Sequence, residues 1–483
     1  MAIADGTTYG ELATHSAAQA RLLLAGRPSL AGARIGVLVP PGPAFVQALL
    51  AIWRAGGVAV PLTPLHPAPE LAHILSVSAP EMVIVDPGLA IHLDQLATPP
   101  RLDVETLLAA RARGTPPGDL RSGGTPDVAP PTNAEPALML FTSGTTGKPK
   151  GVRLSHGGIA ATLDSLHQAW RWRPDDRLLH VLPLHHTHGL IVALLGALWA
   201  GATVQFAPFD ATAVWKAFAD VSVFMAVPTM YVRLMEVFTA APPERQAALA
   251  AGARGLRLCT SGSAALPAEL HASFAAATGQ AILERYGMTE IGMALSNRYE
   301  GPRLAGSVGV PLPGVTVDVT DDDGRPVPDG QPGELRVRSP QLFIDYAGDA
   351  QATGAATDHQ GRFRTGDTAI RAADGSGVVR LLGRTSVDIL KSGGYKLSAL
   401  EIEDVLRGHP AVADVAVVGV PDAVWGDRVT ACVVARAGHT PTLEELQAFA
   451  ARTLAPYKLP RALRLLATLP RNAMGKVQKS LLK

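Results

Sequence analysis

Residues 141–152, FTSGTTGKPKGV, carry the signal that decides the fold. An apolar run at 137–140 precedes this segment and a helical pattern follows it. Its three glycines let the backbone approach a ligand closely, while its hydroxyls, its successive N–H groups and two lysines suit phosphate oxygens. It is not a Walker A loop, because only two residues separate Gly144 from Gly147 and Pro149 follows Lys148. The segment therefore predicts a phosphate-binding loop of another kind.

Strand-like and helical patterns alternate on the N-terminal side of this loop. Apolar residues recur at helical spacing over 9–24 and 44–56, and short buried strands are expected at 34–39, 58–62 and 82–85. Residues 99–136, rich in proline and glycine, are expected to form a surface connection, after which the alternation resumes through residue 302. This order predicts an α/β fold with covered, mostly parallel sheets.

The pattern changes after residue 311. Short alternating runs at 315–319 and 333–338, separated by DDDG and PDGQPG turns, predict a small, more antiparallel β unit. A compact α+β unit follows from about residue 390, with helices at 399–407 and 443–453 and strands at 412–420, 429–435 and near 463. We therefore predict a large N-terminal domain over 1–382, a hinge over 383–390 and a small mobile C-terminal domain over 391–483.

Composition excludes several classes of protein. Hydrophobic residues make up 47% and charged residues 18% of the 483, which excludes global disorder. The net charge of +1 provides no field to recruit nucleic acid or an anionic membrane. Two cysteines far apart in the sequence indicate neither a disulfide framework nor a cysteine-based zinc site. With no secretory signal and no apolar run near the ~20 residues of a membrane span, we expect a cytoplasmic protein.

Five further segments follow the loop in a fixed order: RYGMTE at 285–290, RTGD at 364–367, GR at 383–384, KSGGYK at 391–396 and PRNAMGK at 470–476. Together with the loop they resemble the motifs of the acyl-adenylate-forming superfamily, which includes acyl-CoA synthetases, firefly luciferase and peptide-synthetase adenylation domains. The resemblance covers nearly the whole chain. It implies an enzyme that joins a carboxylic acid to AMP, releasing pyrophosphate, and then passes the acyl group to the thiol of coenzyme A.

Several residues of these motifs suit ATP. Glu290 offers the hard oxygen that Mg²⁺ prefers, Asp367 can accept both ribose hydroxyls, and Tyr286 offers a flat face for adenine. The simpler interpretations are a solvated glutamate at a helix start and an ordinary turn aspartate. The resemblance implies catalytic roles for Lys476, Glu290 and Thr145, the last two with the metal, and Lys476 bridges the carboxylate and the α-phosphate. The expected ATP/AMP set is Thr142, Ser143, Gly144, Thr145, Thr146, Gly147, Lys148, Lys150, Ser261, Gly262, Ser263, Arg285, Tyr286, Gly287, Met288, Thr289, Asp367, Arg384 and Lys476.

Three histidines lie close together in the segment 182–190, LPLHHTHGL. Three histidines within four residues of a loop do not easily converge on one ion, and no further ligand pattern accompanies them, so a metal site is disfavoured. The segment instead resembles the region that borders the acyl pocket in the superfamily. His186 matches its recurring histidine, whereas His185 stands where an aromatic residue is common.

The identity of the acid is suggested by Arg285, which stands where many relatives that activate fatty or aryl acids have glycine. A buried arginine is costly unless it is paired, and a second carboxylate on the substrate is a natural partner. Together with PTMYVR at 228–233 and SGSAALP at 261–267, this pattern resembles the malonyl-CoA synthetases, with methylmalonate tolerated. The alternative is that Arg285 pairs with Glu284 or Glu290 and that the acid is monocarboxylic. The expected acyl-substrate set is His186, Arg233, Ser261, Arg285 and Met293.

The resemblance also implies how the two steps are divided. The C-terminal domain is expected to bring Lys476 for the first step and the CoA loop, Lys391, Ser392, Gly393 and Gly394, for the second. The hinge departs from the common pattern, because residues 385–387 intervene between the Gly-Arg pair and Asp388. The alternatives are an acyl-CoA synthetase for another short, medium-chain or aryl acid, an adenylation module that loads a carrier protein, and a non-enzymatic nucleotide sensor. Only seven residues follow Lys476, so we expect no carrier domain.

Overall fold

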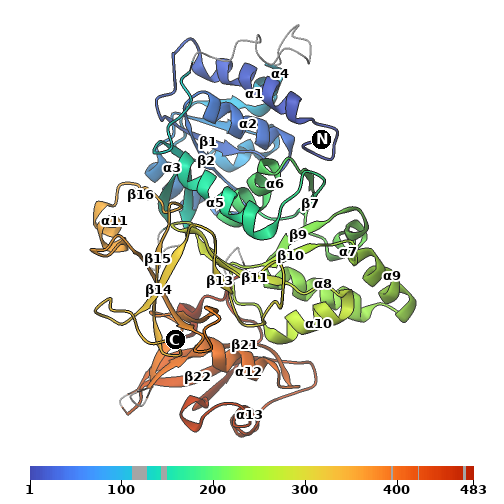
Figure 1. The fold of residues 1–483 in the computed structure, drawn as a ribbon, viewed down its shortest axis with the longest axis vertical. Coiled ribbons are helices and arrows are strands. Elements are labelled where there is room, and N and C mark those ends of the chain that lie inside the picture. The colour runs from blue at the N-terminus through green and yellow to red at the C-terminus, as the bar shows by residue number, and fades with distance from the viewer. Residues whose placement is uncertain (111–127, 143–148, 393–394, 423, 472–474) are drawn as a thin grey trace.

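The structure is a computed structural model that describes residues 1–110, 128–142, 149–392, 395–422, 424–471 and 475–483. The described residues form four β-sheets with helices packed between and around them (Figure 1). The N-terminal elements lie at one end of the long axis and the C-terminal elements at the other. In the described part of the chain, no helix is long and apolar enough to cross a membrane.

The first sheet has the strand order β16-β6-β5-β2-β1-β3-β4. Its central strands are parallel and β6 and β16 are antiparallel. The strands are β1 (Arg34–Leu38), β2 (Val58–Pro61), β3 (Met82–Val85), β4 (Arg101–Asp103), β5 (Pro136–Thr142), β6 (Lys150–Ser155) and β16 (Asp345–Tyr346). The associated helices are α1 (Tyr9–Leu24), α2 (Pro43–Arg54), α3 (Ala68–Ser78) and α4 (Val104–Ala109). The predicted helix at 9–24 is confirmed; Thr8 and Glu11 form a capping box at its start.

The second sheet has the order β13-β12-β11-β10-β9-β7-β8, parallel from β8 to β11. Its strands are β7 (Arg177–His180), β8 (Thr203–Phe206), β9 (Val223–Ala226), β10 (Leu258–Ser261), β11 (Leu283–Met288), β12 (Gly292–Ser296) and β13 (Val310–Pro311). Its helices are α5 (His156–Trp170), α6 (Gly196–Trp199), α7 (Ala211–Ala217), α8 (Pro228–Ala240), α9 (Pro243–Ala253) and α10 (Ala268–Thr278). A π-helix (His188–Leu195), all of whose residues are buried, leads into α6, in which Gly196 and Ala197 are buried and Trp199 is exposed.

The third sheet is the small antiparallel unit that the sequence predicts after residue 311. Its strands, in the order β14-β15-β17-β18, are β14 (Thr316–Thr320), β15 (Pro332–Arg338), β17 (Phe363–Arg371) and β18 (Val379–Arg384), and α11 (Ala350–Ala356) lies beside it. A buried ion-pair network in which Arg336 and Arg362 share Asp358 connects β15 with the start of β17. The network fixes the base of β17, whose later residues face the candidate site.

The fourth sheet belongs to the C-terminal unit, which has its own apolar core. Its strands are β19 (Ile389–Ser392), β20 (Tyr395–Ser398), β21 (Val412–Asp422), β22 (Gly426–Ala435) and β23 (Ala462–Leu465), with helices α12 (Ala399–Arg407) and α13 (Leu443–Ala450). The fold class is confirmed: two large, mostly parallel sheets, a small β unit and a smaller α+β unit. The third sheet ends at Arg384 and the fourth begins at Ile389, inside the predicted hinge, whose function stays a prediction.

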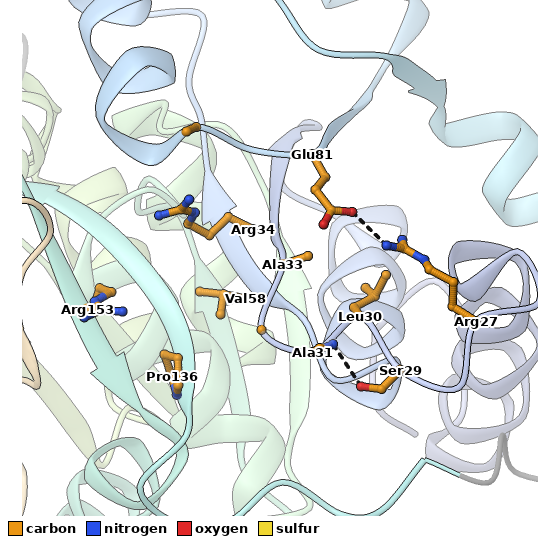
Figure 2. A pocket seen from close by; sticks show the side chains of 12 residues that line it. Arg27, Ser29, Leu30, Ala31, Ala33, Arg34, Val58, Glu81, Pro136 and Arg153 are labelled. Atoms are coloured by element: carbon orange, nitrogen blue, oxygen red, sulfur yellow. Dashed lines mark hydrogen bonds and ion pairs between the residues drawn. The ribbon is translucent and has the colours of Figure 1, made fainter.

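A surface cavity of about 470 Å³ lies at the N-terminal ends of β1 and β2 (Figure 2). Arginine side chains line part of it, and Arg27 forms an ion pair with Glu81 across 3.0 Å. Pro136, which begins β5, also lines this cavity, whereas the predicted phosphate loop follows Thr142 at the other end of the same strand. At about 3.3 Å per residue, these two ends lie roughly 20 Å apart. The cavity is therefore separate from the predicted nucleotide site.

Candidate active site

The predicted site residues gather where the carboxyl ends of β10 and β11 meet the third sheet and the C-terminal tail. Since β10 and β11 are parallel, with Ser261 opposite Glu284, their carboxyl ends share one edge of the sheet. Residues 285–288 lie in β11, and Glu290 lies in the turn before β12. Asp367 comes from β17 and Arg384 from the end of β18. The site is thus assembled from segments more than a hundred residues apart in the sequence.

Arg285 is buried beneath the chain at Gly262. Arg285 is 3% exposed, and a Cβ atom on Gly262 would lie only 2.4 Å from the carbon of its guanidinium group. Its Nε and Nη2 atoms find no hydrogen-bond partner among the described residues. Burial lowers the pKa of Arg285 to about 10, which leaves it charged at neutral pH. The site therefore holds a buried cation with two unused donors.

The two carboxylates that could have paired with Arg285 have other partners. Glu284 accepts a hydrogen bond from the Leu266 backbone N–H at 3.1 Å, and Glu290 accepts one from the Tyr346 hydroxyl at 2.9 Å. Among the described residues, Arg285 Nε and Nη2 donate to neither carboxyl group, and Glu284 Oε2 is likewise buried without a partner. The alternative in which the protein itself neutralises Arg285 is therefore absent from this geometry.

Histidines form one wall beside this arginine. The Nε2 atoms of His186 and His188 are buried and lack a hydrogen-bond partner among the described residues, as does the Ser261 hydroxyl. Burial lowers the pKa of His186 to about 4, helped by the nearby charges of His66 and Lys476. The pKa of His188 is also lowered, first by burial and then by the Arg285 charge. These rings are therefore neutral polar groups, not cations, at physiological pH.

The His185 ring lies against the His186 ring, with centroids 3.9 Å apart and planes tilted by 49°, and burial lowers the pKa of His185 to about 2. The described ranges contain no group of three or more histidine, cysteine, aspartate or glutamate side chains that could hold a metal ion. The histidine segment therefore supplies buried aromatic and polar surface beside Arg285.

Tyr286, Asp367 and Arg384 form a second corner of the site. The Tyr286 hydroxyl donates to Asp367 Oδ2 at 2.5 Å, and Arg384 Nε lies 3.1 Å from Asp367 Oδ1. Arg384 Nη1 also donates to the Thr365 carbonyl at 2.6 Å. Burial raises the pKa of Asp367, and the positive charge of Arg384 opposes that rise. Side chains from three strands therefore converge where the resemblance expects the ribose.

Glu290 is held by residues that the sequence analysis did not single out. Tyr346 donates to it, and Lys150 Nζ lies 4.9 Å from the centroid of the Tyr346 ring and 3.4 Å from Asp349 Oδ2. Burial raises the pKa of Glu290. No local pattern marks Tyr346 or Asp349, because β16 reaches Glu290 only by pairing with β6. Thr142 ends β5, whereas Ser143, Gly144, Thr145, Thr146, Gly147 and Lys148 lie outside the described residues.

Lys476 reaches this region from the C-terminal tail. A Cβ atom on its neighbour Gly475 would lie 3.8 Å from Thr229 in the first turn of α8, so the tail contacts the second sheet's helices. The Lys476 side chain keeps solvent exposure. Its pKa is nevertheless lowered, first by desolvation of the ammonium and then by the Arg384 charge, while Asp367 opposes the shift. Lys476 therefore lies within electrostatic reach of both corners of the site.

The remaining predicted residues are placed unequally. Arg233 is exposed on α8. Met293 is buried, and a Cβ atom on Gly287 would lie 2.2 Å from its terminal methyl. In the CoA loop, Lys391 is exposed and its N–H donates to Asp427 at 2.8 Å, while Ser392 is buried.

Of the other residues named from the sequence, Ser263 has a positive φ of 68° and its hydroxyl lies 3.5 Å from His188 Nδ1. The Thr289 hydroxyl receives a hydrogen bond from Thr187 at 3.0 Å, and Met288 ends β11. Gly393 and Gly394 lie outside the described residues.

The fold is that of an adenylate-forming enzyme. The chain belongs to the AMP-binding enzyme family: the model of that name matches residues 2–347, and the model of the AMP-binding enzyme C-terminal domain matches 401–476. The resemblance read from the motifs and the ligase class that it implied are confirmed. One relative is the mitochondrial malonate–CoA ligase ACSF3 of Homo sapiens, 41% identical over 93% of this chain and 82% of its own length.

Two solved structures are similar along almost the whole chain. ATP-bound MatB from Rhodopseudomonas palustris gives a TM-score of 0.87 at 35% identity, covering 98% of this chain and 92% of that one. A malonyl-CoA ligase in a ternary product complex with methylmalonyl-CoA and AMP gives 0.69 at 40% identity, covering 97% and 96%. The arrangement of the present chain is therefore closer to the ATP-bound structure, although its sequence is closer to the other.

Proposed function

We propose that this chain is an ATP-dependent malonyl-CoA synthetase. It joins malonate to AMP with release of pyrophosphate and then transfers the malonyl group to the thiol of coenzyme A, releasing AMP. Methylmalonate is a tolerated substrate. The names of the similar proteins, a malonate–CoA ligase and a ligase with methylmalonyl-CoA bound, support this proposal.

The observation that carries the proposal is the pair of unpartnered donor atoms, Nε and Nη2, on buried Arg285. His186 Nε2, His188 Nε2 and the Ser261 hydroxyl also lack partners among the described residues, and the Arg285 charge lowers the pKa of His188. An unpaired buried charge is strongly unfavourable, and a carboxylate can accept two parallel hydrogen bonds from a guanidinium. A diacid satisfies these donors with its far carboxylate, while its near carboxylate stays free to attack ATP. A monocarboxylic acid would leave the guanidinium unpaired.

The same geometry ranks the acids. One extra methyl group changes the fit by only about 1–3 kcal/mol, whereas the loss of the charged partner costs more. We therefore expect malonate to be preferred, methylmalonate to follow, and acetate and longer fatty acids to be poor. Arg233, exposed on α8, is proposed to contribute to the acyl end only as a secondary positive charge.

In the first step the protein must hold ATP and neutralise charge that develops between the carboxylate and the α-phosphate. Lys476 is proposed to stabilise that charge, and its lowered pKa is consistent with a desolvated ammonium. Tyr286 and Asp367 bind the adenosine, and the loop that contains Thr145 binds the phosphates together with Lys150.

Glu290 fits a magnesium ion bound with ATP. Its buried carboxylate is a hard oxygen donor, oriented by the Tyr346 hydroxyl, and Mg²⁺ usually takes one or two protein carboxylates together with phosphate oxygens. Thr145 is the second proposed ligand. When bound, the ion would neutralise negative charge on the phosphates.

In the second step the CoA thiol attacks the acyl carbonyl of the adenylate, the carbon–oxygen bond to AMP breaks, and AMP leaves with its phosphate. Dividing the reaction in this way replaces one difficult step with two easier ones. The loop from Lys391 to Gly394 is proposed to line the CoA path after the C-terminal unit turns about the hinge.

The direct test is to incubate the protein with ATP, Mg²⁺ and CoA and one of malonate, methylmalonate, acetate or octanoate. Pyrophosphate release is followed for each acid and the thioester is identified by mass. A preference for octanoate or acetate would overturn the malonate assignment and favour another acyl-CoA synthetase. Release of pyrophosphate with no thioester would favour a module that loads a carrier protein, and no nucleotide chemistry at all would favour a sensor.

We also propose a cytoplasmic location, with no nucleic-acid or membrane partner. Both cysteines, Cys259 and Cys432, are buried free thiols, which suits a reducing compartment. The relative from Homo sapiens is described as mitochondrial, so fractionation of the native cells distinguishes the two compartments.

A further inference from the structure

Three buried charged side chains meet at the base of the C-terminal tail. Lys479 Nζ lies 2.5 Å from Asp388 Oδ1 and 2.6 Å from Glu403 Oε1. The Lys479 side chain is only 8% exposed, and those of Asp388 and Glu403 are 14% and 7% exposed. One lysine therefore joins two carboxylates from different segments, residue 388 before β19 and residue 403 in α12.

Asp388 is also tied to the end of the third sheet. Its Oδ2 accepts the Arg384 backbone N–H at 3.0 Å, and its own N–H donates to the Arg384 carbonyl at 2.7 Å. This close turn needs a glycine at 383, because φ is +121° there and a Cβ atom would lie 2.4 Å from Asp388 Cβ. Asp388 therefore folds back on the predicted hinge.

From Arg384 the network continues to the nucleotide corner. The Arg384 guanidinium binds Asp367, which accepts the Tyr286 hydroxyl. An unbroken chain of contacts thus runs from Lys479 through Asp388 and Arg384 to Asp367. Each of these contacts is polar and directional, so together they fix the position of Lys479 relative to Asp367.

Lys479 stands three residues after Lys476, and two hydrogen bonds hold the residues on either side of Lys476. The Gln478 N–H donates to the Pro470 carbonyl at 2.8 Å, and Arg471 Nη1 donates to the Gly475 carbonyl at 2.6 Å. These hydrogen bonds join residues on the two sides of the segment that carries Lys476. Lys479, which follows this segment, links it to Asp388 in the predicted hinge.

We propose that Lys479 is a positioning residue for adenylate formation, because it links the segment that carries Lys476 to Asp388 in the predicted hinge. The inference rests on the role of Lys476 in the proposed function. Misplacement by about 1 Å can cost on the order of 100-fold in rate, so loosening this anchor impairs the step that uses Lys476. The thioester step, which uses the other arrangement of the C-terminal unit, does not depend on it.

The test separates the two half-reactions in the variant Lys479→Met. Adenylation is measured as acid-dependent exchange of pyrophosphate into ATP, and thioester formation as single-turnover transfer from pre-formed acyl-adenylate to CoA. We expect exchange to fall by about 10- to 100-fold and transfer to stay within about 2-fold of the wild type. Lys479→Arg, which keeps the charge, restores most of the exchange.

The matched control is Lys458→Met. Lys458 also forms a short ion pair within the C-terminal unit, with Glu401 at 2.6 Å, but it contacts neither Asp388 nor Glu403. This variant leaves both half-reactions unchanged. If Lys479→Met does not fold, the double variant K479M/E403Q, which removes the stranded glutamate charge as well, is measured in its place.

Equal losses in both half-reactions of a folded variant would assign Lys479 a structural role only, and no loss in either would show that the anchor is not needed. Failure of the proposed function is a separate result. If wild-type protein does not activate malonate, the same ratio is measured with the acid that it does activate. If Lys476→Ala retains exchange, both the role of Lys476 and this inference fall.

Discussion

The Tyr286 hydroxyl donates a hydrogen bond to Asp367 across 2.5 Å and thereby joins the second parallel sheet to the small antiparallel sheet. Both residues are buried, and Arg384 completes the corner from the neighbouring strand β18. The contact fixes the orientation of the carboxylate that is proposed to bind the ribose. It therefore links the docking of two sheets to the affinity for ATP.

The variant Tyr286→Phe keeps the ring and removes only this hydrogen bond. Since a hydrogen bond to a charged group contributes about 1.5–3 kcal/mol, we expect the KM for ATP to rise by about 10-fold or more. Steady-state kinetics at saturating acid measure the change. Tyr9→Phe is the control, because Tyr9 donates to the Ala202 carbonyl at 2.6 Å far from the site. An unchanged KM for ATP would contradict the role of Tyr286.

Replacement of Arg285 by methionine tests the acid-binding end. We expect kcat/KM for malonate to fall by about 100-fold or more, as loss of one partner of a buried charge pair costs about 2–5 kcal/mol. The melting temperature of the ligand-free protein is expected not to fall, because two donor atoms of the removed cation, Nε and Nη2, have no partner among the described residues. Kinetics and thermal melting are measured on the same preparation.

Arg233→Met is the companion variant, since Arg233 is exposed and Arg285 is buried. A smaller loss than in Arg285→Met is expected. If Arg233→Met instead gave the larger loss for malonate, the binding role would move from the buried arginine to the exposed one.

Gly262→Ala tests the same cation without removing it. A methyl group at this position would lie 2.4 Å from the guanidinium of Arg285 and must displace it. We expect malonate turnover to fall at least 10-fold, a loss worth about 1.4 kcal/mol, while the protein stays folded. Gly255→Ala is matched to it, because the corresponding methyl group meets nothing within 4 Å. Equal behaviour of the two alanine variants would show that the close approach at Gly262 is unimportant.

Glu284 gives the stability a predictable dependence on pH. Burial raises its pKa from 4.5 to about 8, and Asp404 adds a smaller increase. Between these values the folded chain keeps a proton that the unfolded chain releases, so this group makes the free energy of unfolding fall as pH rises. Urea unfolding at about pH 6 and about pH 8 should show a smaller decrease in Glu284→Gln than in the wild type.

The control for this measurement is Glu236→Gln, which changes an exposed glutamate on α8. It should reproduce the wild-type pH dependence. A wild-type slope that persists in Glu284→Gln would assign the proton to another group.

Each helix and strand named from a local pattern has a counterpart in the structure, but the segment 99–136, expected to be a surface connection, contains β4 and α4. The helix at 9–24 agrees at both ends, and the predicted strands at 412–420 and 429–435 lie within β21 and β22. The ends of helices were predicted less accurately: the helix expected over 443–453 ends at Ala450. Periodicity identifies which face of an element is buried, but the end of a helix depends on a few capping contacts.

The motifs of the sequence supplied the candidate site residues, but not the residues that contact them and hold them in place. Arg285, Asp367 and Glu290 stand in recognisable segments, whereas Tyr346 and the anchor Lys479 do not. Their partners are distant in the sequence, and a lysine such as Lys479 has no pattern that marks it as buried. The interpretation of Glu290 as a solvated residue at a helix start is wrong, because it is buried in a turn between two strands.

The low pKa values of His185 and His186 determine how the candidate site responds to pH. The pKa values of His185 and His186, about 2 and about 4, lie below any ordinary intracellular pH. Changes of pH within that range therefore leave the charge of these rings constant, so the diacid selectivity proposed above does not depend on their protonation.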